Sequence, residues 1–198
     1  NTNFTRDARD YYFNPRQGSY YIAEAGWAGG WLGGEDNDYS IVGAVQRYAR
    51  VGRSAVFAWR VRAGYAKAFG DSRETGLPLE RRFYTGGGNS VRGYRENSLG
   101  PVNELGDALG GGVQIITNAE LRFDLPYLSR WHFGGAVFLD GGNVWERAEE
   151  ITFGDFGTIG TADAEREDYM LSTGVGIRYH TPVGPIRLDV GFPLRRTA

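Results

Sequence analysis

Residues 113–125 read VQIITNAELRFDL, and two kinds of side chain alternate along this stretch. Positions with odd numbers are apolar or small, whereas most positions between them are polar. Successive side chains of a β-strand point to opposite faces, so the stretch predicts a strand with one apolar and one polar face. The apolar face is Val113, Ile115, Thr117, Ala119, Leu121, Phe123 and Leu125, and the polar face is Gln114, Asn118, Glu120, Arg122 and Asp124.

The same alternation returns before and after this stretch. It is clear in residues 55–66, AVFAWRVRAGYA, where aromatic and aliphatic residues share one face and two arginines share the other. It recurs in residues 131–140, 169–180 and 186–194, and more weakly in residues 19–28 and 39–50. These runs have about the nine to eleven residues that a tilted strand needs to cross a bilayer.

Two architectures fit such strands: a soluble β-sandwich and a transmembrane β-barrel. The polar face is rich in Arg, Glu, Asp and Asn, while the apolar face ends in aromatic residues, as in a barrel with a wet lumen. Short turns at 126–130 and 180–185 also alternate with long loops at 70–111 and 146–168. Short turns on one side and long loops on the other favour the all-β, antiparallel transmembrane barrel, and the sandwich stays as the alternative.

Composition narrows the class of protein further. The chain has 198 residues, a net charge of −2, no cysteine, 31 glycines and 14% aromatic residues. A near-neutral charge argues against a nucleic-acid partner, and the lack of cysteine excludes disulfides and thiolate metal sites. No run approaches the roughly 18 apolar residues of a transmembrane helix. Many glycines and aromatic residues together are typical of short strands joined by tight turns.

Catalytic chemistry has weak support. The run GGGNS at 86–90 resembles a phosphate cradle but lacks the lysine and hydroxyl residue of a P-loop. His132 and His180 lie near expected strand ends, and either could be imagined beside Ser172, but no Ser, His and acid have the spacing of a triad. We expect these to be water-facing polar residues.

Two other groups of residues have structural interpretations. The acidic segment 146–168 is expected to be an external loop, with divalent-cation binding as the less common alternative. The tryptophans are expected to anchor the barrel at the membrane interface instead of forming a ligand site. They are Trp27, Trp31, Trp59, Trp131 and Trp145.

The segment FYTGGGNSVRGYRENSLGP at 83–101 resembles the signature loop of the outer-membrane protein assembly and translocation superfamily, whose members include BamA, TamA and the two-partner secretion transporters. Further motifs follow the family's order along nearly the whole chain. They are TRDARDYYFNPRQGSYY at 5–21, NAELRF at 118–123, FLDGGNVW at 138–145 and RYHTPVGPIRLDVGFPL at 178–194.

This resemblance implies a sixteen-stranded antiparallel barrel, of which residues 1–198 match about eight strands of the C-terminal half. The family's final strand and its periplasmic POTRA domains are expected to be absent, so the chain is expected to be part of a longer one. The end of one strand is expected at 4–13. Further strands are expected at 19–28, 39–50, 54–68, 112–125, 131–145, 168–181 and 184–194.

The resemblance also implies a site. The loop at 70–111 is expected to fold back into the lumen, where Arg92 contacts the wall acids Glu120 and Asp140. Alternation independently places both acids on the polar face. A guanidinium suits such an anchor because it matches carboxylates and stays charged. Without the resemblance, Arg92 reads equally well as a solvated loop residue.

The rest of the loop motif is expected to support this anchor. Val91 and Tyr94 are expected to pack against the wall on either side of the Arg92–Gly93 pair. Gly93 and the glycines at 86–88 are expected to permit positive φ and close backbone approach. The three glycines are Gly86, Gly87 and Gly88.

The function that the resemblance implies is insertion and assembly of other barrel proteins in the bacterial outer membrane, without catalysis, metal or cofactor. The implied partners are outer-membrane lipid, lipopolysaccharide and unfolded outer-membrane protein clients. Assembly lipoproteins or an inner-membrane partner are further candidates. A two-partner secretion pore is one alternative function, and a barrel enzyme or passive porin is another.

Overall fold

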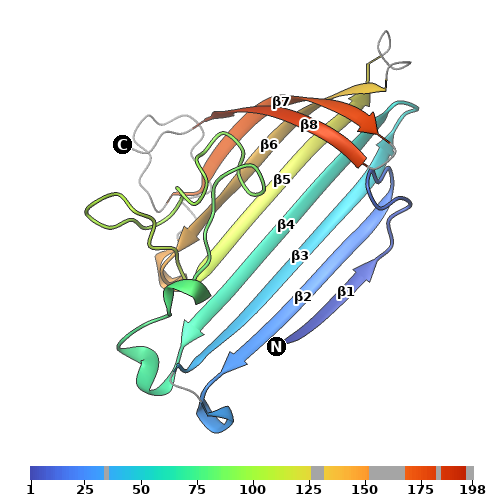
Figure 1. The fold of residues 1–198 in the computed structure, drawn as a ribbon. Helices are drawn as coiled ribbons and strands as arrows, with labels where there is room; N and C mark the ends of the chain where they lie inside the picture. Colours follow the sequence, from blue (N-terminus) through green and yellow to red (C-terminus); the bar gives the residue numbers. More distant parts are fainter. Residues whose placement is uncertain (34–35, 126–131, 152–167, 182–183, 195–198) are drawn as a thin grey trace.

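The computed structural model describes residues 1–33, 36–125, 132–151, 168–181 and 184–194. These residues form one antiparallel sheet in which each strand pairs with the next along the chain (Figure 1). The predicted all-β antiparallel fold is therefore confirmed. The strands are β1 (Thr2–Asp7), β2 (Gly18–Ala28), β3 (Asp38–Val51), β4 (Ala55–Ala68), β5 (Val113–Asp124), β6 (Phe133–Trp145), β7 (Met170–Thr181) and β8 (Gly184–Pro193).

The first strand is shorter than the sequence predicts. It ends at Asp7, not near residue 13, because local side-chain hydrogen bonds turn the chain there. The Asp7 carboxylate accepts the backbone N–H of Arg9 at 3.1 Å, and the Asp10 carboxylate accepts those of Arg16 and Gln17 at 2.9 and 3.2 Å. Such Asp-to-backbone bonds compete with strand pairing and favour turns.

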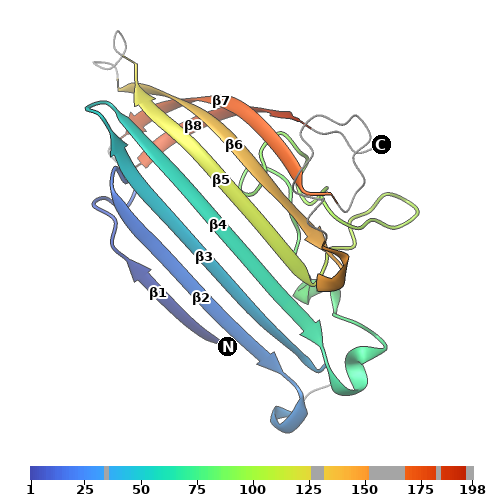
Figure 2. The same ribbon diagram turned by 180° about the vertical axis from the view of Figure 1, so that it is seen from behind.

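The sheet is strongly curved, with β7 and β8 arching over one side (Figures 1 and 2). Its convex face is apolar and exposed, as alternation predicts: along β7 and β8 the outward side chains are between 42% and 70% exposed. Exposed apolar side chains in such rows form a lipid-facing surface, since soluble monomers rarely show a patch of this kind. These side chains are Val175, Ile177, Tyr179, Ile186, Leu188, Val190 and Phe192.

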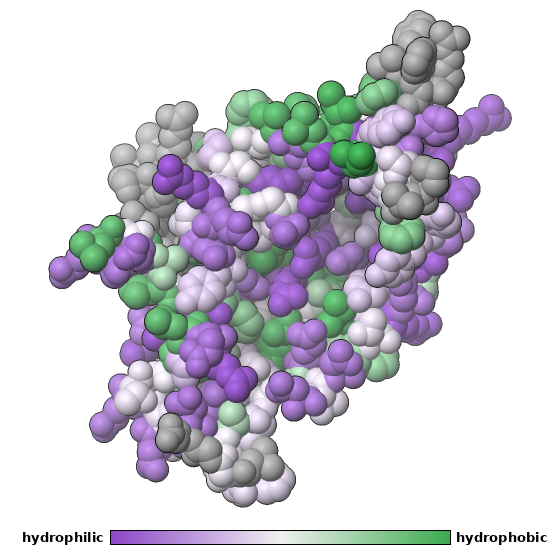
Figure 3. All heavy atoms as spheres, viewed as in Figure 1, coloured by the Kyte–Doolittle hydropathy of each residue, from purple (hydrophilic) through white to green (hydrophobic). Residues whose placement is uncertain are grey.

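The long connection between β4 and β5 lies on the concave face, so it does not extend away from the sheet (Figures 1 and 2). Its first part has two 3-10 turns, η2 (Gly70–Arg73) and η3 (Leu79–Arg81). Isolated antiparallel bridges then hold it together, including Phe83 with Gly111 and Thr85 with Leu99. Hydrophilic residues gather over this loop and around a hollow beside it (Figure 3).

In the part of the chain that the structure describes, the other helical elements are η1 (Gly30–Leu32) and η5 (Ala148–Glu150). Within the described ranges, none of the helices has the length and apolar character needed to cross a membrane.

Tryptophans differ in how they fit the expected interfacial role. Trp27 and Trp31 are 49% and 85% exposed, whereas Trp145 is fully buried in a cluster with Val113 and Tyr169. The prediction of a membrane-facing anchor is therefore wrong for Trp145, because its neighbours cover the ring. Trp131 lies outside the described residues.

Candidate functional site

Strand register brings acidic side chains together on the concave face. Asp140 of β6 pairs with Asn118 of β5, and Glu120, two residues along β5, pairs with Phe138. Both acids face the concave side, where Asp140 is 0% and Glu120 is 8% exposed. Buried carboxylates need cationic partners, since charge without compensation is costly away from water.

Arg92 supplies that partner from the loop. Its Nε and Nη2 donate to the two Asp140 oxygens at 2.6 and 2.9 Å, which is a bidentate fork, and its backbone N–H donates to Asp140 Oδ2 at 3.2 Å. Its Nη1 donates to Glu120 Oε2 at 2.6 Å. The structure thus brings the three predicted residues into one cluster.

Other residues of this cluster were not predicted as site residues. Asp189 of β8 accepts from Arg92 Nη1 at 3.1 Å, and Arg178 of β7 bridges Glu120 and Asp189. Arg122 of β5 donates to Glu120 Oε1 at 2.7 Å. Three arginines therefore balance three carboxylates, and the network reaches all of the last four strands. The polar-face alternation of β7 and β8 was the available signal for Arg178 and Asp189.

An aromatic ring completes the surroundings of the guanidinium. The Arg92 Cζ lies 3.5 Å from the centroid of the buried Phe138 ring, which is a cation–π contact. Phe138 pairs across the strands with Gly174, whose missing side chain leaves room for that ring. Phe138 thus provides an apolar surface against which the guanidinium packs in an otherwise charged site.

The site keeps Arg92 ionised. Burial by itself lowers the pKa of Arg92, but the hydrogen bonds and charges of Asp140 and Glu120 outweigh burial and hold that pKa above its ordinary value. An arginine does not deprotonate at physiological pH in any case, so this cluster is suited to holding and not to proton transfer.

Apolar contacts flank the charged cluster. Val91 is fully buried and forms a cluster with Leu99 and Met170, and the partly buried Tyr94 packs against this cluster. The Tyr94 hydroxyl also donates to the backbone carbonyl of Leu171 at 3.0 Å. The residues on both sides of the Arg92–Gly93 pair thus hold the loop against β7.

Only some of the motif's glycines occupy positions that require glycine. Gly86 and Gly87 have φ of +115° and +93°, a region that glycine adopts most easily. Gly93 has φ of +94° and stacks on β8, where a Cβ added to Gly191 would lie 2.7 Å from Gly93 N. Gly88 is different: its φ is not positive and a Cβ would meet nothing within 4 Å, so the prediction of a conformational need there is wrong.

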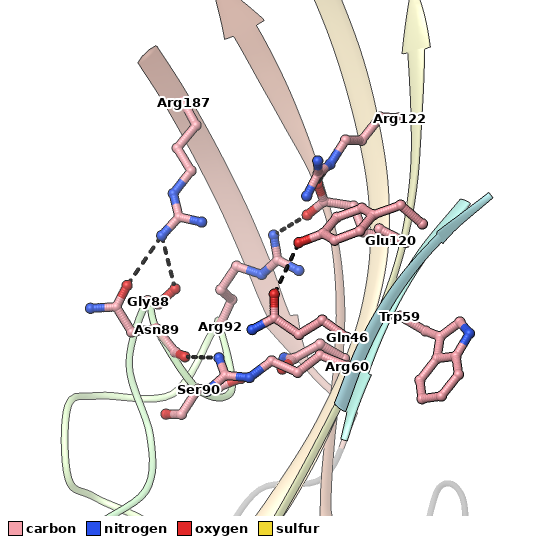
Figure 4. A pocket seen from close by; sticks show the side chains of 13 residues that line it. Gln46, Trp59, Arg60, Gly88, Asn89, Ser90, Arg92, Glu120, Arg122 and Arg187 are labelled. Atoms are coloured by element: carbon pink, nitrogen blue, oxygen red, sulfur yellow. Dashed lines mark hydrogen bonds and ion pairs between the residues drawn. The ribbon is translucent and has the colours of Figure 1, made fainter. Parts of the chain in front are cut away.

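A second contact region lies at the loop tip, residues 88–90, beside a polar cavity of about 260 Å³ (Figure 4). Here the wall donates and the loop accepts. Arg60 Nη1 donates to the Asn89 carbonyl at 3.3 Å, Asn118 donates to the Ser90 carbonyl at 2.7 Å, and Arg187 donates to Asn89 Oδ1 at 3.2 Å. We call this region the tip contact.

Catalytic candidates do not come together. Ser172 and His180 lie eight residues apart on β7, roughly 26 Å at a strand rise of about 3.3 Å per residue. His132 accompanies His180, because the His180 N–H donates to the His132 carbonyl at 2.9 Å. Among the described residues, no cluster of three or more His, Asp or Glu has metal-ligand geometry. Most of the acidic segment at 146–168 lies outside the described residues.

Curved strands, a lipid-facing exterior and a loop anchored on a polar inner face are the features of one part of the wall of an outer-membrane β-barrel; the described sheet is open, with β1 and β8 as its two edges. A family model described as the Omp85 superfamily domain matches residues 1–198, and the chain belongs to this superfamily.

The chain is similar to named members. It is 28% identical over 194 residues to the "Outer membrane protein assembly factor BamA" of Nitratidesulfovibrio vulgaris, covering 96% of this chain and 22% of that protein. It is 27% identical over 198 residues to a SAM50-like protein of Schizosaccharomyces pombe, covering 98% and 40%. The structure of BamA from Haemophilus ducreyi lacking POTRA domains 1–3 has a TM-score of 0.76 at 20% identity, covering 99% and 38%.

These matches place the chain in the bacterial outer membrane and in the C-terminal portion of a BamA-type barrel. The chain spans between about a fifth and two fifths of the length of these relatives.

Proposed function

We propose that this chain is part of an outer-membrane protein insertion and assembly factor. We further propose that the loop anchored through Arg92 stabilises the barrel wall during insertion of client proteins. The relatives described as assembly factors support the general activity. One observation supports the role of the loop: Arg92 and its partners connect β5, β6, β7 and β8, and β8 is an edge of the described sheet.

The physical reason lies in how strands are added to a barrel. An incoming strand pairs with the unpaired backbone N–H and C=O groups of a strand edge. Such addition requires that the rest of the wall keep its register and curvature. A buried ion network across β5, β6, β7 and β8 resists separation of these strands, since breaking one buried pair costs about 3–5 kcal/mol.

The proposed partners are unfolded outer-membrane protein clients and the lipid around the barrel, including lipopolysaccharide. Accessory lipoproteins or an inner-membrane partner are further proposed partners. The proposed mechanism uses no cofactor, because the cluster holds charges in place and the loop presents no activated nucleophile.

The test replaces Arg92 by Glu in the complete protein, in cells depleted of the unaltered copy. We expect the amount of folded, heat-modifiable client barrels to fall several-fold. The reason is that the introduced carboxylate would be a fourth negative charge beside Glu120, Asp140 and Asp189 and would be repelled by them. Arg95→Glu is the matched control, since Arg95 is an exposed arginine of the same loop. The amount and heat-modifiability of the variant itself are measured in the same samples.

A charge exchange separates anchoring from misfolding. Arg92→Glu combined with Asp140→Arg is expected to recover part of the client assembly, because opposite charges again face each other. Full activity and unchanged heat stability of Arg92→Glu alone would contradict the proposal. Normal client assembly with loss of one secreted substrate would favour the secretion pore. Conductance or hydrolysis that does not depend on Arg92 would favour the porin or the enzyme.

A further inference from the structure

A second site lies at the loop end of the sheet, the end where the connections after β4 and β6 begin. Here β5 starts at Val113, which pairs with Tyr65, so β4 continues past the start of β5. The 3-10 turns η2 and η5, which begin the long connections after β4 and β6, flank the start of β5 (Figure 1). They leave a cavity of about 520 Å³, which we call the rim notch.

Register places the rim notch at the level of an aromatic belt. On the outward face, Trp27 pairs with Tyr39, and Tyr39 pairs with Lys67, so these three form one row across β2, β3 and β4. The rings of Trp27 and Tyr39 stack 6.0 Å apart, and Tyr39 lies 6.0 Å from the ring of Tyr65. Aromatic belts mark the membrane–water interface of outer-membrane barrels, so Lys67 lies where lipid headgroups lie.

The lining of the rim notch is cationic. It contains four basic residues against two carboxylates, those of Glu146 and Glu149. Among the described residues, only one of the four bases has a carboxylate within ion-pair distance, namely Arg147 at 3.9 Å from Glu146. The half-buried Arg82 donates instead to the carbonyls of Leu77 and Leu109 at 2.9 and 3.1 Å. The four bases are Lys67, Arg73, Arg82 and Arg147.

The same cavity has an apolar part. Val113, Leu77 and the ring of Tyr65 line it beside the basic residues. A volume of this size is in the range of small-molecule sites, which combine apolar lining with a few charged groups. A freely soluble anion would use the charges alone, whereas a ligand with both an anionic head and an apolar body would use both parts.

We propose that the rim notch binds a phosphate group of a phosphorylated glycolipid in the outer leaflet. Lysine and arginine side chains are the usual protein donors to phosphate, and arginine can bind it bidentately. The position of Lys67 in the aromatic row points to a lipid headgroup as the source of the phosphate. This site is independent of the Arg92 cluster, so the two can fail separately.

The test measures binding of three probes to the complete protein in detergent: bis-phosphorylated lipid A, fully dephosphorylated lipid A and inorganic phosphate. We expect the phosphorylated lipid to bind most tightly. Lys67→Gln with Arg147→Gln is expected to weaken its binding about 25-fold, at roughly fivefold per cation removed near a headgroup. Both side chains are exposed, so the variant is expected to fold.

The matched control is Arg53→Gln, which removes an exposed arginine from the β3–β4 turn at the opposite end of the sheet. It is expected to leave binding unchanged. Lys67→Arg is expected to keep binding, because the charge remains. Equal binding of the dephosphorylated lipid, or an unchanged dissociation constant in the double variant, would overturn the proposal. Inorganic phosphate binding as tightly as the lipid would show a site for free anions and would overturn the lipid assignment.

Discussion

The loop meets the inner face of the sheet at two places, and both use arginine. At the first, the arginine belongs to the loop and meets wall carboxylates: Arg92 is 8% exposed and reaches Glu120, Asp140 and Asp189. At the tip contact the arginines belong to the wall and meet uncharged oxygen atoms of Asn89 and its neighbours.

The difference lies in what remains when one partner is lost. Removing Arg92 leaves Asp140 with no cation within ion-pair distance among the described residues, at 0% exposure. Removing an arginine of the tip contact leaves a carbonyl or amide beside a polar cavity that water can fill. Contacts of the same side-chain type therefore differ in strength because burial and partner charge differ.

The largest expected effect is that of Arg92→Ala. Loss of a buried ion-pair partner costs about 3–5 kcal/mol, and we expect this cost to appear as release of the loop segment 88–95. Hydrogen exchange measured by mass spectrometry should show protection of this segment lost. Arg95→Ala, which removes an exposed side chain of the same loop, should leave protection unchanged. Equal protection in Arg92→Ala would show that apolar packing alone holds the loop.

The two wall carboxylates, Asp140 and Glu120, should contribute unequally to the stability of the anchored loop. Asp140 makes three hydrogen bonds to Arg92 and none is shared with another cation among the described residues, whereas Glu120 is shared by three arginines. We therefore expect Asp140→Asn to cost about 3 kcal/mol of local stability, near the lower limit for a broken buried pair. We expect Glu120→Gln to cost the loop about half as much, near the value of one charged hydrogen bond of about 1.5 kcal/mol. The same exchange measurement ranks the two, and the reverse order would make Glu120 the principal anchor.

The close approach of Gly93 to Gly191 gives a third prediction. A Cβ at position 191 would lie 2.7 Å from Gly93 N and 2.8 Å from Arg92 C, both of which are backbone atoms that cannot rotate away. Gly191→Ala should therefore push the loop off β8 and cost about 1–3 kcal/mol, the usual range for overpacking. Gly43→Ala is the matched control, because a Cβ there meets nothing within 4 Å. A crystal structure of the variant with the loop unmoved would contradict this.

Alternation alone predicted β4 to β8, more weakly β2 and β3, and the faces of Glu120 and Asp140, because a strand has a two-residue period whatever its neighbours do. It also put Arg178 and Asp189 on the polar face. It gave no way to select them as members of the cluster, because which polar groups meet depends on the register of four strands. That register is set by pairing over long sequence distances.

Three features of the structure were predicted wrongly or were missed. The family resemblance predicts the end of a strand at 4–13, but the strand ends at Asp7 because the Asp7 and Asp10 carboxylates turn the chain. Trp145 is of a residue type that often anchors barrels at the membrane interface, but it is covered by Tyr169, which lies 24 residues later in the chain. The need for glycine at Gly191 depends on a loop almost a hundred residues earlier. The first outcome depends on hydrogen bonds within one segment, whereas the other two depend on contacts between segments far apart in the sequence.

The smallest expected effect tests the tip contact. Arg187 is exposed and donates to Asn89 Oδ1 at 3.2 Å and to the Gly88 carbonyl at 3.5 Å. Exposed polar contacts are usually worth less than about 1 kcal/mol, so Arg187→Gln should raise hydrogen exchange at residues 88–90 modestly and leave residues 91–94 unaffected. Arg6→Gln, an exposed arginine on β1, is the control. If Arg187→Gln released residues 91–94 as Arg92→Ala is expected to do, the two contacts would be one cooperative unit. The contrast between a charged anchor and a weak tip would then be wrong.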